Sequence, residues 1–455
     1  EVKNQYKDCI LFYRLGDFYE MFFDDALTAS RELEITLTGR DCGQEERAPM
    51  CGVPYHACDI YINKLIEKGY KVAICEQMED PKLAKGLVKR EVIRIVTPGT
   101  NMSQAILDET RNNYLMCIFG CNEEYGLAVC DITTGEFRSC HVSSTAKLYD
   151  EINKYSPTEI IGNGAFLSCD LNFDYMKEKM KITISEAPSH YFNDDTCEDF
   201  IKRQFKVGSI DGLGIEDDQE DILISVGALL QYLHETQKNS LDHINRMDVY
   251  SIEDYMIIDS SSRRNLELTE TLRDKQKRGS LLWVMDKTKT AMGARMLRNM
   301  IEQPLIHKDD IETRLDAIAE LNNSVIDRDE IREYLNTIYD LERLMTRISL
   351  RTANPRDLLA FKTSIHLLGN FYSDGLTEIR EGIDDLHDLY ELLDRAIVDE
   401  PPILIREGGI FKDGYLEDID TLKNATTDGK NWIAELEARE REKTGIKNLK
   451  IKFNK

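Results

Sequence analysis

The chain has 455 residues, 42% hydrophobic and 31% charged, which is the composition of a globular protein rather than a disordered or fibrous one. This length exceeds what one hydrophobic core supports, so we expect three or four domains. With 58 basic and 83 acidic residues the net charge is −25, which argues against binding of nucleic acid through a broad basic surface and leaves only local basic patches for that purpose.

Membrane segments and metal centres are not predicted. No stretch reaches 18 uncharged apolar residues, and the first residues, Glu-Val-Lys-Asn-Gln, lack the apolar region of a secretory signal. We therefore expect a cytoplasmic protein. The eleven cysteines all precede residue 200 and form no CxxC pair, so we expect reduced thiols and no metal site.

The first hundred residues predict an α/β domain. Apolar runs and helical spacing alternate with segments rich in proline and glycine. The expected elements are a strand at 10–15, a helix at 24–33, a loop at 49–54, a helix at 60–68, and strands at 71–75 and 93–96.

A second α/β unit follows, and it begins with hairpins. Short apolar runs separated by turn residues predict strands, and an apolar face at helical spacing predicts a closing helix. The expected elements are strands at 115–120, 126–132 and 136–142, a helix at 145–154, a strand at 159–161 and a helix at 222–233.

After about residue 250 the pattern is helical. Met292, Met296, Leu297 and Met300 recur at helical spacing, and so do the apolar residues between 338 and 348. The charged segment 435–443 predicts a solvated helix. The fold class is therefore multidomain, α/β followed by all-α.

Several motifs, in order along the chain, resemble the MutS family of mismatch-recognition proteins. Residues 12–20, Phe-Tyr-Arg-Leu-Gly-Asp-Phe-Tyr-Glu, are similar to the family's Phe-x-Glu motif. Further similar segments are 48–57, 72–77, 96–100, 263–267, 292–297, 340–343, 351–356 and 441–445. The resemblance implies a mismatch-binding domain (1–105), a ribonuclease-H-like connector (106–247), a helical core or lever (248–425) and the start of a helical clamp (426–455).

The resemblance assigns mismatch reading to Phe18 and Glu20. A mismatched pair is poorly stacked, so an apolar ring such as that of Phe18 can kink the duplex there at lower cost than at an intact step. A carboxylate near phosphates is repelled, so Glu20 would be tolerated best where a displaced base donates to it. If the chain is extended here, both side chains point to the same side. Without the family resemblance, the aromatic run at 18–22 would ordinarily be interpreted as part of the hydrophobic core.

Contacts with the DNA backbone are expected from basic residues in the same domain, although each could equally belong to a solvated face. These candidates are Arg40, Lys85, Lys89, Arg90 and Arg94. We predict no catalytic residue. The expected function is binding of base mismatches and small insertion or deletion loops to initiate repair.

The alternative is a ribonuclease-H-like nucleic-acid-processing enzyme built on the second domain. Asp131 lies at the end of a predicted strand, where such nucleases carry a metal-binding carboxylate. Two-metal chemistry needs several converging acidic ligands. A carboxylate cluster around Asp131 would therefore favour this alternative.

No phosphate-binding loop is present in the sequence. The Gly429-Lys430 pair is followed by Asn431, and Asn424 stands where the motif needs its first glycine. We therefore expect no enzymatic activity and no cofactor for this chain, and we expect it to be the N-terminal portion of a longer protein. For the full-length family protein the resemblance implies an ATPase that uses ATP and Mg²⁺, a homodimer, and a MutL-type repair partner.

Overall fold

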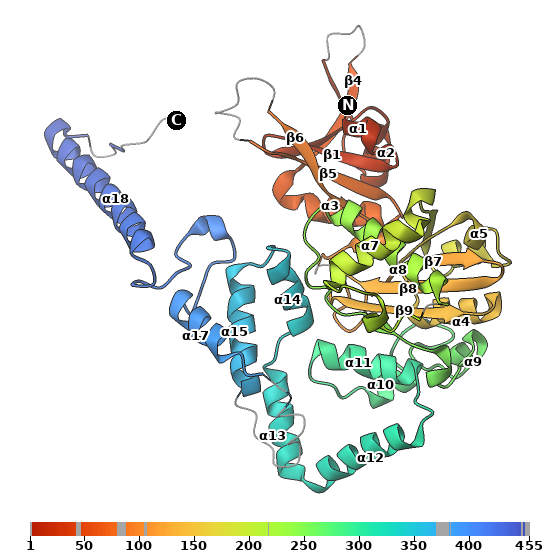
Figure 1. The fold of residues 1–455 in the computed structure, drawn as a ribbon. Coiled ribbons are helices and arrows are strands. Elements are labelled where there is room, and N and C mark those ends of the chain that lie inside the picture. The colour runs from red at the N-terminus through yellow and green to blue at the C-terminus, as the bar shows by residue number, and fades with distance from the viewer. Residues whose placement is uncertain are drawn as a thin grey trace. The chain divides into compact units, whose positions relative to one another are not determined.

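A computed structural model describes residues 2–41, 47–79, 88–103, 107–216, 218–369, 382, 384–446 and 449–450. The chain divides into two compact units (Figure 1). The first unit comprises residues 1–336 and 340–352, and the second comprises residues 337–339 and 353–455.

The first sheet has six strands in the order β3-β4-β2-β1-β5-β6. Strands β1 and β5 are parallel, and the other neighbouring pairs are antiparallel. The strands are β1 (Cys9–Leu15), β2 (Phe18–Phe22), β3 (Thr38–Arg40), β4 (Ala48–Pro54), β5 (Lys71–Gln77) and β6 (Arg90–Val96). The predicted strands at 10–15, 71–75 and 93–96 are confirmed.

Two helices cover one face of this sheet, and their apolar stripes explain why. Helix α2 (Phe23–Leu33) contributes alanine and leucine at helical spacing, and α3 (Cys58–Glu67) contributes isoleucine and leucine. The predicted helices at 24–33 and 60–68 are thus confirmed. A short helix α1 (Val2–Gln5) precedes β1. The buried core includes Phe12, Tyr19, Met21, Ala26, Ala29, Leu33, Ile62, Leu65 and Ile66.

The predicted loop at 49–54 is wrong, because these residues form β4. Cys51 and Val53 are almost fully buried in the core, and this burial outweighs the turn-prone composition. The prolines lie at positions 49 and 54, near the two ends of the strand, where a missing backbone donor costs little.

The second sheet also has six strands, in the order β11-β10-β7-β8-β9-β12. Strands β7, β8 and β9 form an antiparallel meander, whereas β10 runs parallel to β7 and to β11. The strands are β7 (Leu115–Cys121), β8 (Glu124–Asp131), β9 (Glu136–Val142), β10 (Glu159–Gly162), β11 (Thr183–Glu186) and β12 (Asp248–Val249). The predicted strands of this domain are confirmed.

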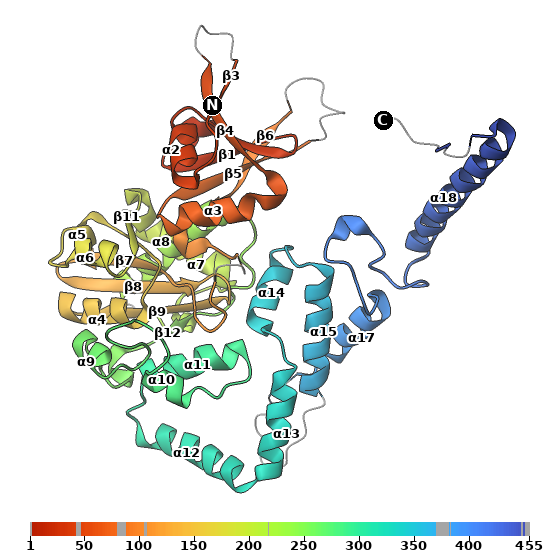
Figure 2. The same cartoon turned by 180° about the vertical axis from the view of Figure 1, so that it is seen from behind.

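Helices pack on both faces of the second sheet, as its two separate apolar clusters require. Helix α8 (Glu220–Gln237) and α7 (Asp194–Phe205) belong to one cluster, and α4 (Thr145–Tyr155) belongs to the other. The smaller helices are α5 (Gly164–Leu167) and α6 (Phe173–Glu178), and α6 lies beside β11 (Figure 2). The predicted helices at 145–154 and 222–233 are confirmed.

Helices make up the rest of the first unit. They are α9 (Ser260–Asn265), α10 (Leu281–Met285), α11 (Ala291–Glu302), α12 (Lys308–Asn323), α13 (Val325–Asn336) and α14 (Leu341–Ser349). The periodicity at 292–300 therefore predicts a helix correctly. It does not identify the buried face, because Met296 is exposed on α11 whereas Arg295 is buried.

The second unit is helical where it is described. Its helices are α15 (Pro355–Gly369), α17 (His387–Ala396) and α18 (Glu417–Thr444). Helices α15 and α17 pack through the stacked rings of His366 and Tyr390, whose centroids are 4.6 Å apart. The predicted helix at 435–443 lies within α18, and Gly445 ends that helix in a left-handed conformation with φ of 72°. Within the described ranges, no helix is both long enough and apolar enough to cross a membrane.

Candidate nucleic-acid interface

The β1–β2 hairpin places Phe18 directly after a tight turn. Leu15 pairs with Phe18, so only Gly16 and Asp17 form the connection. Gly16 has φ of +58°, a conformation that two-residue hairpins require and that glycine adopts without strain. The ring of Phe18 is therefore held at the tip of the sheet by backbone geometry.

Alternation along β2 separates packing from exposure. Tyr19 and Met21 are buried in the core, whereas Phe18 on the opposite face is 47% exposed. The core-packing interpretation of the aromatic run therefore applies to Tyr19 and not to Phe18. An apolar ring with this exposure is available for contact with another molecule.

Glu20 lies on the same face of the strand as Phe18, because the chain is extended here. Its partner on β4 is Gly52, and a Cβ at position 52 would lie 3.5 Å from the Cγ of Glu20. An alanine at position 52 would make ordinary van der Waals contact with the side chain of Glu20.

Arg40 neutralises this carboxylate. Its Nη1 atom lies 2.7 Å from Oε2 of Glu20, and its guanidinium carbon lies 5.9 Å from the centroid of the Phe22 ring. The Arg40 side chain is 48% exposed and that of Glu20 is 18% exposed, so the cation is the outer member of the pair. The sequence predicts Arg40 as a phosphate contact but contains no signal for this ion pair, which depends on β4 lying between β2 and β3.

A second arginine, Arg14 on β1, connects the hairpin to Tyr55 and to Glu76 on β5. The guanidinium carbon of Arg14 lies 3.7 Å from the centroid of the Tyr55 ring, and its Nη1 lies 3.5 Å from a carboxylate oxygen of Glu76. Glu76 also accepts a hydrogen bond from the hydroxyl of Tyr19. Burial, followed by this hydrogen bond, raises the pKa of Tyr19, which therefore stays a neutral donor. Sequence reasoning missed this network, although Arg14 and Glu76 both stand in the quoted motifs.

The remaining basic candidates lie in different environments. Lys89 is exposed and pairs with Glu91 at 2.7 Å, and Arg90 donates from Nε to the carbonyl of Arg14 at 3.0 Å. Arg94 donates to the carbonyl of Thr100 at 2.9 Å, and burial lowers the pKa of its guanidinium to about 10. Lys85 lies outside the described residues.

Asp131 has no accessible carboxylate. It is fully buried, and its Oδ1 accepts hydrogen bonds from the backbone and hydroxyl of Thr133 at 2.9 and 2.7 Å. Its Oδ2 accepts from the amide of Asn112, which also donates to Glu136. Burial raises the pKa of Glu136.

The surroundings of Asp131 therefore satisfy its oxygens with neutral donors. In the described part of the chain, no three His, Cys, Asp or Glu side chains are grouped so that they could hold a metal ion. The carboxylate cluster that the nuclease alternative needs is not found around Asp131.

Family models match three consecutive parts of the chain. MutS domain I matches residues 1–105, MutS domain II matches residues 113–245, and MutS domain III matches residues 261–455. The Phe18 and Glu20 pair thus lies in the part that is similar to MutS domain I.

Curated relatives match the entire chain. Proteins named DNA mismatch repair protein MutS are 60% identical over 462 residues in Lachnoclostridium phytofermentans, 54% over 466 in Acetivibrio thermocellus and 52% over 466 in Ruminiclostridium cellulolyticum. Each alignment covers 100% of this chain and 50 to 53% of the relative. The chain spans about half the length of these relatives.

Proposed function

The chain belongs to the MutS family, and we propose that it binds DNA at base mismatches and small insertion or deletion loops, in the cytoplasm, as the first step of mismatch repair. One observation carries the proposal. An exposed phenylalanine and a carboxylate, Phe18 and Glu20, lie on one face of strand β2 beside an exposed arginine.

The proposed wedge is Phe18. Inserting an apolar ring between base steps requires unstacking, which costs roughly a few kcal/mol at an intact step and less at a mispair. Because Phe18 is held at a two-residue turn, little freedom is lost when the ring enters the minor groove. The ring therefore favours sites where the duplex is already weakly stacked.

Glu20 is the proposed reader of the displaced base, and Arg40 is its counter-ion. On perfect duplex no displaced base donates to the carboxylate, and phosphates repel it, so it opposes binding. At a mispair the displaced base donates to it. Arg40, the more exposed member of the pair, then turns toward a phosphate while the base replaces it at Glu20.

Lys89 and Arg90 are proposed phosphate contacts, together with Lys85. A chain with a net charge of −25 can approach DNA only where such residues gather. Arg94 is left out of this proposal because its guanidinium is bonded inside the domain.

We propose that this chain holds neither ATP nor Mg²⁺ and that both belong to the full-length family protein. Gly429, the glycine of the Gly-Lys pair, lies inside helix α18, whereas a phosphate-binding loop joins a strand to a helix. The Gly429-Lys430 pair therefore does not fit the phosphates of a nucleotide. We further propose, from family membership, the domain boundaries given above, a second copy of the protein and a MutL-type protein as partners.

The test is a binding titration of the full protein that carries this chain against heteroduplex and homoduplex of the same length. Both titrations are run at one salt concentration, because affinity for DNA depends steeply on salt. Tighter binding to heteroduplex supports the proposal. Equal affinity for the two duplexes contradicts it.

A further inference from the structure

The segment that joins the two sheets has little structure of its own. Residues 107–113 lie between the η2 turn that follows β6 and strand β7, without a helix or strand. Its shape comes from Asp108, whose carboxylate accepts from the backbone N–H and the hydroxyl of Thr110 at 2.8 and 2.7 Å. The carbonyl of Asp108 accepts from the backbone N–H of Arg111 at 3.2 Å, whereas no backbone bond from the described residues of the segment reaches the carbonyls of Glu109 and Arg111.

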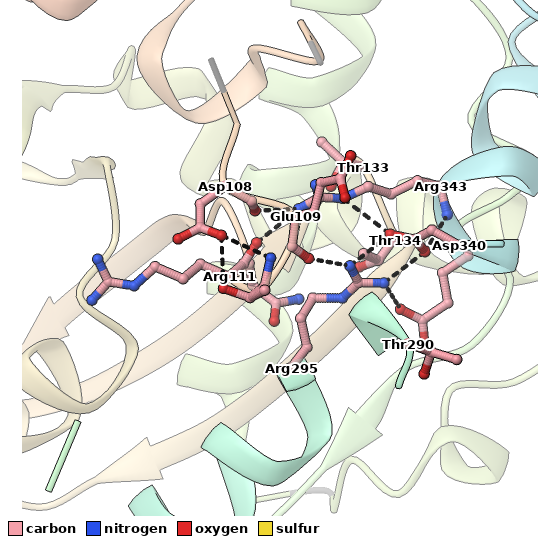
Figure 3. Close-up of polar contacts among 12 residues, drawn as sticks. Asp108, Glu109, Arg111, Thr133, Thr134, Thr290, Arg295, Asp340 and Arg343 are labelled. Atoms are coloured by element: carbon pink, nitrogen blue, oxygen red, sulfur yellow. Dashed lines mark hydrogen bonds and ion pairs between the residues drawn. The ribbon is translucent and has the colours of Figure 1, made fainter. Parts of the chain in front are cut away.

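Two distant arginines bind those carbonyls (Figure 3). Arg343 on α14 donates from Nη2 to the carbonyls of Asp108 and Arg111, at 3.2 and 2.7 Å. Arg295 on α11 donates from Nη1 to the carbonyl of Glu109 at 2.8 Å. Both arginines are buried, at 3% exposure for Arg295 and 7% for Arg343.

Two carboxylates at the N-terminal end of α14, the N-cap Asp340 and Glu342, hold the guanidinium of Arg295 in place. Asp340 accepts a bidentate pair from Arg295 at 2.7 and 2.8 Å, and Glu342 accepts at 2.6 Å. Asp340 also caps α14 by accepting from the backbone N–H of Arg343 at 3.3 Å. Burial alone would lower the pKa of Arg295, but the bonds to Asp340 and Glu342 outweigh it and the pKa is raised.

The arrangement is therefore a three-part latch, composed of the 108–111 main chain, Arg295 and the 340–343 turn. A guanidinium can serve it because its donors form a rigid planar fork that reaches several acceptors at once. A lysine ammonium cannot reach a carbonyl of the segment and a bidentate carboxylate in the same way. Residues 340–352 belong to the first compact unit, so the latch lies within one unit.

We infer that Arg295 and Arg343 are positioning residues that couple the mismatch-binding domain to helix α14 through the main chain of residues 108–111. The inference rests on the proposed function, since it concerns how the same DNA-reading domain is held. In this role the two arginines act through the main chain of residues 108–111 and not through contacts of their own with DNA. They fix the one connection through which the chain leaves that domain, so a displacement of the domain on DNA is transmitted to the start of α14.

The first test is hydrogen exchange of the protein without DNA, in two reciprocal variants. In Arg343→Lys we expect the amides of residues 109–111 to exchange about tenfold faster, because charge-assisted hydrogen bonds to the segment are lost. In Asp108→Ala, which removes no arginine, we expect the amides of Arg343 and Leu344 to exchange faster by about the same factor.

The matched control is Arg138→Lys. Arg138 is buried to a similar extent and bonds Asp248 and Gln303 at 2.9 and 3.0 Å, but it bonds no atom of residues 107–113. Its replacement should leave exchange in both segments as in wild type. If Arg343→Lys and Asp108→Ala each change only their own segment, there is no coupling and the inference is wrong. Should Arg343→Lys fail to fold, Asp108→Ala decides alone.

The second test is mismatch preference, with Phe18 and Glu20 intact. We expect the ratio of heteroduplex to homoduplex affinity to fall about 2- to 30-fold in Arg343→Lys, the range that such coupling energies produce, and to stay unchanged in Arg138→Lys. An unchanged ratio in Arg343→Lys contradicts a role in DNA reading. If wild type itself shows no preference, the proposed function fails, whereas the exchange test still decides the coupling.

Discussion

Phe18 and Tyr19 are neighbours with opposite roles, and the strand geometry of β2 accounts for the difference. Tyr19 is buried and bonded to Glu76, whereas Phe18 contributes nothing to the core and stands at an exposed turn. The same alternation brings Glu20 to the side of Phe18. At the scale of single side chains, the residues proposed for binding and the residues that form the core are therefore different members of one strand.

We predict that Phe18→Ala abolishes mismatch preference and leaves the fold intact. The ring is half exposed, so its removal creates no cavity and should change the free energy of unfolding by less than about 1 kcal/mol. Binding to both duplexes and the thermal midpoint Tm are measured. Trp283→Ala, an equally exposed aromatic at 48%, is the control and should keep the preference. A large drop in Tm for Phe18→Ala would mean that Phe18 is a core residue.

We predict that Glu20→Ala binds homoduplex as well as wild type or better, while its mismatch preference falls toward one. Removal of the carboxylate relieves its repulsion from phosphates and also deletes a hydrogen bond from the displaced base. A bond to a charged acceptor is worth roughly 1.5 to 3 kcal/mol, so the ratio of affinities should fall by roughly tenfold or more. Titrations at matched salt measure this ratio. If Glu20→Ala keeps the wild-type ratio of heteroduplex to homoduplex affinity, then Glu20 does not contribute to mismatch preference and Phe18 alone does.

The ion pair leads to a further prediction for Arg40→Ala. Without Arg40 the carboxylate of Glu20 is uncompensated, so binding to both duplexes should weaken. In Arg40→Ala with Glu20→Ala, homoduplex affinity should recover relative to Arg40→Ala alone. Additive effects of the two substitutions would show that the pair does not act as a unit on DNA.

In the second domain, helix α8 approaches strand β8 and helix α7 so closely that two contact positions have no room for a side chain. At Gly126 on β8, an added Cβ would lie 1.9 Å from the carbonyl oxygen of Asp221, the second residue of α8. The same occurs at Gly227 on α8, where a Cβ would lie 2.3 Å from the Cβ of Cys197 on α7. Glycine is thus required where this helix crosses the sheet and its neighbour.

We predict that Gly126→Ala destabilises the protein by about 3 kcal/mol or more, because backbone atoms must move to admit the methyl group. Gly208→Ala is the matched control, since nothing lies within 4 Å of an added Cβ there, and it should change stability by less than about 0.5 kcal/mol. Urea unfolding followed by circular dichroism gives both values. Equal stability of the two variants would contradict the close packing of α8 on β8.

For the chain as a whole, two features bear on its proposed activity: its net charge and the sequence around Gly429. A net charge of −25 opposes the approach of nonspecific duplex, so the proposed DNA binding depends on a small number of specific contacts. The second unit ends in the described residues with the long helix α18, and Gly429 within it is part of a regular helix. Helix α18 therefore does not form a phosphate-binding loop at Gly429.

We predict that these 455 residues, purified as such, do not hydrolyse ATP. Phosphoryl transfer requires a loop whose backbone amides bind the phosphates, and the sequence contains none. Release of phosphate is measured with and without Mg²⁺. Turnover that disappears on substitution of a residue within the chain would overturn this prediction.

The fold class, most helices and strands, and the common face of Phe18 and Glu20 could be predicted from the sequence because they depend on local periodicity, whereas the role of this pair in mismatch reading stays a prediction. Four features depended on the tertiary structure. Segment 49–54 is a strand because its neighbours bury it, Arg94 bonds inward, and Arg40 reaches Glu20 across β4. Arg343 binds Asp108 from 235 residues away. Each of these is a contact between residues whose spacing in the sequence has no period, so sheet order and helix packing decide it rather than any local preference.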